Sequence, residues 1–177
     1  MTEFLTVVPP AFVVLAAALA VAVLPRLLGH AVGALSTLWI LAVGLFAPDG
    51  NFWEIGFLGF ETIFLQIDGL SQLVAIAAGI LATAAVVYAY SSDAPKLMTA
   101  LALTYVGSTA GVIFAGDWVS LIAWWEFMAV TSTLLVWHHG GKAVRAGYRY
   151  ALAHGIGGSL FLFAIVWHLA VGGGLLI

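Results

Sequence analysis

The stretch Trp118–Trp137, WVSLIAWWEFMAVTSTLLVW, is an apolar run interrupted by one charged residue, Glu126. A helix of about 20 apolar residues is long enough to cross a hydrocarbon core about 30 Å thick. At about 1.5 Å per residue, Glu126 falls roughly 12 Å from one end of the run and 16 Å from the other. A carboxyl group this near the midplane costs on the order of 2.5–3.5 kcal/mol on insertion scales, so it marks a functional site by default. The alternative is a neutral, hydrogen-bonded glutamic acid that fixes helix packing.

The residues one helical turn from Glu126 are aliphatic, so any partner of the carboxyl group must come from another helix. Burial favours a protonated carboxyl group, whereas a nearby cation favours a carboxylate. A group held between these two effects exchanges protons near neutral pH. We therefore predict that Glu126 is a proton relay.

The composition is that of a membrane protein. The chain of 177 residues is 64% hydrophobic and 7% charged, with a mean hydropathy of +1.15, whereas soluble domains are about 25% charged. It has no cysteine, which excludes disulfides and thiolate metal sites. The small net charge of −3 argues against a nucleic-acid partner. We predict no cofactor and no metal site, and we interpret the first apolar segment as a retained helix because no basic residue precedes it.

Hydropathy predicts an all-α, polytopic helical bundle that forms a single transmembrane domain over residues 1–177. Asn51–Ile67, between the second and third spans, is rich in β-branched and aromatic residues and contains Gly56 and Gly59. This pattern predicts an extended hairpin at the membrane surface. The six expected spans cover residues 4–24, 31–47, 69–90, 97–114, 118–137 and 147–171.

The charges separate by side. With six spans, the five basic residues fall on one side of the membrane, whereas the acidic residues outside the spans fall on the other, except Asp93. The positive-inside rule then places the basic side in the cytoplasm and both chain ends outside. The basic residues are Arg26, Lys96, Lys142, Arg145 and Arg149.

Other polar residues could assist Glu126. His154 lies in the sixth span, and a buried imidazole can pass protons in both directions at physiological pH, although a hydrogen-bonded packing histidine is equally expected. Lys142, Arg145 and Arg149 precede or open the same span. Their ordinary roles are topology and headgroup contacts. The functional alternative is a cation that tunes Glu126, for which Arg149 is best placed.

Glycines in the last spans predict close helix packing. Gly107 and Gly111 are spaced as G-x-x-x-G, a common helix-packing motif in membranes. Gly155, Gly157 and Gly158 lighten the sixth span in the same way. No strand precedes them and no lysine follows, so they do not form a phosphate-binding loop.

Several segments together resemble the antiporter-like membrane subunits. These proteins include the D-type subunits of Mrp multisubunit cation/proton antiporters and the proton-pumping membrane subunits of respiratory complex I. The resemblance covers roughly residues 60–177. It is carried by Ile67–Ser71, Gly116–Trp118, Trp124–Met128, Ser132–Trp137, Ala146–Tyr150 and Gly157–Leu160.

The resemblance implies a function. In that family the glutamate matched by Glu126 pairs with a lysine on a broken seventh helix and takes part in proton transfer. Such subunits have about fourteen helices, so this chain corresponds to the N-terminal part of one, either as a split subunit or as a fragment. We expect a proton-translocating subunit of a multisubunit cation/proton antiporter in the cell membrane. Its expected partners are other membrane subunits, the lipid bilayer, protons and Na⁺.

Three alternatives remain open at this stage. The first is the membrane module of a complex I-like or hydrogenase-type redox-driven proton pump. The second is a non-transporting scaffold subunit. The third, an intramembrane enzyme, is disfavoured because Ser159 and His154 are spaced on different faces of a helix. We expect a transporter subunit rather than a catalytic one.

Overall fold

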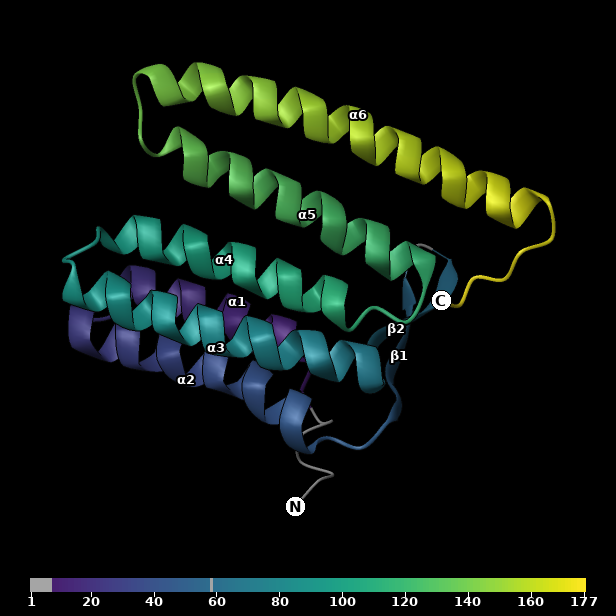
Figure 1. Cartoon of the computed structure of the whole chain (residues 1–177), viewed down its shortest axis with the longest axis horizontal. Coiled ribbons are helices and arrows are strands. Elements are labelled where there is room, and N and C mark those ends of the chain that lie inside the picture. The colour runs from purple at the N-terminus through teal and green to yellow at the C-terminus, as the bar shows by residue number, and fades with distance from the viewer. Residues whose placement is uncertain (1–7, 58) are drawn as a thin grey trace.

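The computed structural model describes residues 8–57 and 59–177, and it contains a helical bundle with one β-hairpin (Figure 1). The predicted all-α bundle and the hairpin between the second and third helices are both confirmed. In chain order the elements are α1 Pro10–Val23, α2 Arg26–Phe46, β1 Gly50–Phe57, β2 Phe60–Ile67, α3 Gly69–Ser91, α4 Lys96–Ile113, α5 Trp118–Trp137 and α6 Lys142–Ala170.

Helix ends differ from the expected span ends. Helices α2 to α6 are long and apolar enough to cross a membrane, whereas α1 has 14 residues. α2 begins at Arg26 rather than at residue 31, and α6 begins at Lys142 rather than at residue 147. A span predicted from hydropathy ends at charged residues. A helix instead begins where the backbone conformation allows it, and here α2 begins after Pro25 and α6 after Gly141. α1 begins at Pro10, and residues 4–7 of the expected first span lie outside the described residues.

The helices run alongside one another, with α6 at one edge of the bundle and α5 between α6 and α4 (Figure 1). Both glycines of the G-x-x-x-G motif lie at helix contacts, as predicted. A Cβ on Gly107 would meet Leu15 of α1 at 3.0 Å, and one on Gly111 would overlap the indole of Trp124 in α5. Small residues therefore set how closely α4 approaches its two neighbours.

A third glycine contact, between α3 and α2, leads to a stability prediction. A Cβ on Gly79 would lie 2.7 Å from the backbone nitrogen of Leu41, and a backbone cannot swing aside as a side chain can. We expect Gly79→Ala to lower the free energy of unfolding by about 1–3 kcal/mol, as overpacking does. Thermal unfolding of the purified protein in detergent measures this change. Gly69→Ala is the matched control, because nothing lies within 4 Å of that position; equal losses in both variants would contradict the packing argument.

The hairpin is joined to the bundle through the α4–α5 connection. β1 and β2 pair antiparallel with Gly56 opposite Glu61. The backbone N–H of Gly116 donates to Ile63 O at 2.9 Å, and the N–H of Ile63 donates to Asp117 Oδ2 at 2.7 Å. The segment after α6 returns to the same place, where Trp118 N–H donates to Leu175 O at 3.1 Å. The hairpin, the start of α5 and the last residues of the chain thus form one end of the bundle.

Two aspartates begin helices by the same chemistry. Asp117 accepts from Val119 and Ser120 at the start of α5, and Asp68 accepts from Ser71 at the start of α3. The Ser71 backbone N–H also holds the pKa of the exposed Asp68 carboxyl group below its ordinary value. Both caps satisfy N–H groups that a helix leaves free.

Candidate functional site

Glu126 lies where α5 meets α6. A Cβ added to Gly158 of α6 would overlap Glu126 Oε1, so the carboxyl group occupies space that any other residue at position 158 would fill. Within residues 8–57 and 59–177, Glu126 makes no hydrogen bond and no ion pair, and its side chain is exposed on the surface of this chain. A carboxyl group in the middle of a membrane helix is expected to have a polar partner, and no such partner lies within the described residues.

His154 lies one turn before Gly158 on the same face of α6, about 6 Å along the helix axis. Its side chain is half-buried between Trp125 and Tyr150, with ring centroids 5.7 Å and 5.5 Å away. The Nε2 atom of His154 is buried without a hydrogen-bond partner among the described residues, as is Nε1 of Trp125. The structure therefore places the predicted histidine one turn of α6 from the glycine that the predicted glutamate contacts.

A hydroxyl pair follows His154 toward the start of α6. Ser132 Oγ of α5 and Tyr150 Oη of α6 are 2.9 Å apart. Ser132 Oγ also donates to the carbonyl of Ala129 at 3.0 Å, which leaves the tyrosine hydroxyl as the donor to the serine. This pair was not among the predicted site residues.

Aromatic rings continue the α5–α6 contact in the other direction, toward the hairpin end. Phe161 packs against Trp125 at 5.7 Å and Trp118 at 6.4 Å between ring centroids, and Trp118 lies 5.9 Å from His168. We call this whole contact the α5–α6 seam. It comprises Trp118, Trp125, Glu126 and Ser132 of α5, and Tyr150, His154, Gly158, Phe161 and His168 of α6.

A repeat every two turns could have revealed the seam in the sequence. On α5 the residues are Trp118, Trp125 and Ser132, and on α6 they include His154, Phe161 and His168. This spacing keeps residues on one helix face. Tryptophans near helix ends are also typical of the membrane interface. Because that interpretation already explains the aromatic residues, the repeat is easily missed.

The basic cluster does not face Glu126. Lys142, Arg145 and Arg149 are exposed and make no ion pair within the described residues. At about 100° per residue they lie roughly opposite Gly158 around α6, and Arg149 is about 13 Å from it along the axis. Glu126 and His154 thus lie at the same α5–α6 contact, whereas the three cations point away from it. A tuning role for Arg149 stays a prediction.

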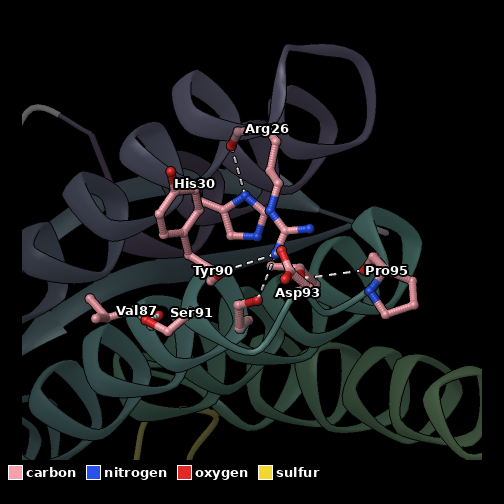
Figure 2. Close-up of polar contacts among 9 residues, drawn as sticks. Arg26, His30, Val87, Tyr90, Ser91, Asp93 and Pro95 are labelled. Atoms are coloured by element: carbon pink, nitrogen blue, oxygen red, sulfur yellow. Dashed lines mark hydrogen bonds and ion pairs between the residues drawn. The ribbon is translucent and has the colours of Figure 1, made fainter.

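A second polar cluster joins α2 to α3 at the basic end of the bundle (Figure 2). Arg26 donates to the carbonyl of Tyr90 at 2.8 Å, lies over the Tyr90 ring and forms an ion pair with Asp93 at 3.1 Å. Asp93, the one exception to the predicted charge separation, is thus partnered by Arg26. Lys96 instead donates to the carbonyl of Leu24 at 2.6 Å. These contacts fix helix ends and leave Arg26 bound rather than available to Glu126.

Comparisons with known proteins show which proteins this chain is similar to. No family model matches the chain. A relative from Rhizobium meliloti (strain 1021), named as a probable K⁺/H⁺ antiporter A/B subunit, is 34% identical over 105 residues, which cover 56% of this chain and 10% of the relative. A chain in the structure of the membrane-bound sulfane sulfur reductase (MBS), an archaeal respiratory membrane complex, superposes with a TM-score of 0.79 at 23% identity. The match covers 95% of this chain and 28% of that chain.

These comparisons bear out the predicted resemblance at a coarse level. The chain spans about a tenth of the curated relative and little more than a quarter of the solved chain. Its fold is that of a chain in a respiratory membrane complex, and part of its sequence is similar to an antiporter protein. The protein is a multi-pass membrane protein that shares its fold with a chain of an archaeal respiratory membrane complex and part of its sequence with an antiporter subunit.

Proposed function

We propose that this chain is the N-terminal, proton-relaying part of one of the subunits of a monovalent cation/proton antiporter. That subunit is of the Mrp D type and lies in the cell membrane, with the basic end of the bundle in the cytoplasm and both chain ends outside. Glu126 binds and releases the proton. The observation that carries this proposal is a mid-depth carboxyl group that lies against Gly158, one turn of α6 from His154, with no partner of its own within the described residues.

The missing partner fits an incomplete subunit. A midplane carboxylate is stabilised by a cation from a neighbouring helix, and the basic residues of this chain lie at one end of the bundle. We propose that a lysine on a further helix, in the same or another polypeptide, supplies that charge. The chain's small share of its relative supports this interpretation. When the cation approaches, Glu126 releases its proton, and when the cation withdraws, Glu126 binds one.

The coupling ion is a monovalent cation. The name of the relative specifies K⁺, whereas the resemblance to Mrp subunits implies Na⁺. We propose that the cation crosses elsewhere in the complex and that this chain handles the proton.

Glu126→Gln in the intact complex tests the proposal. The amide keeps the size of the side chain but cannot take up or release a proton, so we expect proton flux to fall on the order of 100-fold. The measurement is the collapse of an imposed pH gradient in inverted vesicles after addition of Na⁺ or K⁺. Glu61→Gln is the matched control, because that carboxylate is exposed on the hairpin, and it should retain flux.

The other outcomes have distinct meanings. Unchanged flux in Glu126→Gln would reject the relay. A reduced yield of complex with normal flux per assembled complex would instead identify a scaffold protein. Flux that depends on an electron donor rather than on a cation gradient would place the same relay in a redox-driven pump.

A further inference from the structure

His30, near the start of α2, carries a buried polar atom without a partner. Its side chain is only 4% exposed, and Nδ1 donates to the backbone carbonyl of Arg26 at 2.8 Å. When the hydrogen is on Nδ1, the other nitrogen of a neutral imidazole is an acceptor. That acceptor, Nε2, is buried and makes no hydrogen bond among the described residues. Because buried polar atoms are almost always hydrogen-bonded, His30 indicates a donor from outside the described chain.

His30 also lines a cavity of about 190 Å³ between α2 and α3. Apart from Tyr90, the other side chains that line this cavity are apolar, among them Leu27, Ala31 and Val87. Water in a cavity needs two to four polar partners, and apolar walls supply few of them. The volume is also smaller than the roughly 300–1,000 Å³ of pockets for drug-sized ligands. An alkyl chain with a hydrogen-bond donor at its polar end fits such a cavity.

Charged groups of both signs lie next to the cavity, at the basic end of the bundle (Figure 2). The Arg26 guanidinium carbon and the His30 ring lie 5.6 Å and 5.5 Å from the centroid of the same Tyr90 ring. Within the described residues, only Nη2 of Arg26 has partners, so its Nε–H and Nη1–H groups remain for another molecule. Asp93, the ion-pair partner of Arg26, is 89% exposed and adds a carboxylate beside these donors.

The unpartnered nitrogen of His30 lies at the level of these charges. A helical side chain leans toward the N-terminus of its helix, so the His30 ring lies beside the turn that begins at Arg26. The hydrogen bond from Nδ1 to Arg26 O agrees with this placement. A donor in a lipid headgroup can therefore meet Nε2 while the lipid's hydrocarbon chain continues into the cavity.

We propose that this cleft, formed by Arg26, His30, Tyr90 and Asp93 with the cavity, binds a phospholipid that has a phosphoethanolamine headgroup. Arg26 donates to the phosphate through Nε and Nη1. The ammonium group donates to His30 Nε2 and lies near the Asp93 carboxylate, and one acyl chain lies in the cavity. Basic pockets between transmembrane helices bind lipid headgroups. The site is separate from the α5–α6 seam, and it goes beyond the proposed function.

The residues of the cleft distinguish this headgroup from two others of similar size. A phosphocholine headgroup has the same charges but no N–H, so it leaves His30 Nε2 without a donor. A phosphoglycerol headgroup has hydroxyl donors but no cation, so its net negative charge lies beside Asp93. Phosphoethanolamine alone of the three supplies a phosphate for Arg26, an N–H donor for His30 and a positive charge for Asp93.

Native mass spectrometry of the purified complex tests this selectivity. The complex is delipidated in detergent and given equimolar phosphatidylethanolamine with phosphatidylcholine, or phosphatidylethanolamine with phosphatidylglycerol, all with the same acyl chains. We expect the wild type to retain one phosphatidylethanolamine about tenfold better than either competitor, which is the effect of one hydrogen bond to a charged group. Equal retention of phosphatidylethanolamine and phosphatidylcholine would mean non-specific surrounding lipid and would overturn the proposal.

Two variants assign the selectivity to its residues. His30→Phe keeps a ring against Tyr90 but removes the acceptor, so the preference over phosphatidylcholine should disappear. Asp93→Asn keeps the shape but removes the charge, so the preference over phosphatidylglycerol should fall about tenfold. Glu61→Gln, which neutralises an exposed carboxylate on the hairpin, is the matched control and should keep both preferences. Because Asp93 is exposed, its variant tests the site even where His30→Phe does not fold. An unchanged preference in Asp93→Asn would overturn the proposed headgroup.

Filling the cavity gives an independent measurement. Ala31 is exposed and lines the cavity, so Ala31→Leu should reduce retention of all three lipids without straining the core. Ala77→Leu is the matched control, because Ala77 is also exposed but lies about 15 Å from Val87 along α3. Equal retention by these two variants would contradict the acyl-chain position. Lipid retention is measured without transport, so this result does not depend on whether Glu126 relays protons.

Discussion

Replacing Gly158 by leucine is expected to reduce proton flux on the order of 100-fold, as far as removal of the Glu126 carboxyl group does, and also to weaken the α5–α6 contact. Even the first carbon of a side chain at position 158 would overlap Glu126 Oε1, so the carboxyl group must leave its place against α6. Misplacement of a reacting group by about 1 Å can cost 100-fold. The measurement is the same pH-gradient assay, alongside the yield and thermal unfolding of the complex.

Gly157→Leu provides the matched control. It places the same side chain one residue away, where nothing in the described chain lies within 4 Å of a Cβ, and it should retain most of the flux. A double-mutant cycle separates the two effects of Gly158→Leu. If the glycine acts through Glu126, then Gly158→Leu should lower flux no further in a Glu126→Gln background. Equal losses in the Gly157 and Gly158 variants would contradict this account.

The fold was largely predictable from sequence because each helix is a long apolar run, and the hairpin is a shorter run that glycines interrupt. Helix starts were less predictable. Helix α2 begins at Arg26, directly after Pro25. The guanidinium group of Arg26 donates to the Tyr90 carbonyl near the end of α3 and pairs with Asp93. Such a contact lets a charged residue continue an apolar helix, and a hydropathy window cannot register it.

The site was predictable in part. Glu126 stands out in any apolar helix, and His154 is the one histidine deep in the sixth span. Whether they meet at the same place depends on which face of α6 packs on α5, and both faces are largely apolar, so hydropathy could not select one. Arg149 was preferred as a tuning cation because it lies within the sixth helix, and hydropathy could not assign its face either. Packing turns the basic stripe away from α5 and turns the two-turn repeat of His154 and Phe161 toward it.

The glycines in the middle of α6 show the same limit. Gly155, Gly157 and Gly158 were all expected to permit close packing, but of these three only Gly158 lies against another helix in the described structure, and the other two have open space. The packing interpretation was therefore wrong for those two positions within this chain. A glycine in an apolar run predicts that a close approach is possible, and only the partner's position shows where it occurs.

Substituting Asp117 by alanine is expected to cause the largest loss of stability, about 3–5 kcal/mol, because three N–H groups would lose a charged acceptor. Its carboxylate is 0% exposed and accepts from Val119, Ser120 and Ile63 at 2.7–2.9 Å, so it ties α5 to β2 as well as capping the helix. Asp117→Asn should lose less, since its one carbonyl oxygen can still cap the helix.

The start of α3 supplies the comparison for Asp117. Asp68 also caps a helix, but it is exposed, and within the described residues its side chain accepts no hydrogen bond from the hairpin. Asp68→Ala should therefore cost only about 1 kcal/mol. Thermal unfolding in detergent measures the stability of both variants. Limited proteolysis of the folded proteins measures how well the hairpin is protected. If α5 capping alone mattered, the two alanine variants would lose equal stability and the hairpin would stay protected. A greater loss in Asp117→Ala, with an exposed hairpin, would show that the buried carboxylate at the start of α5 ties that helix to β2.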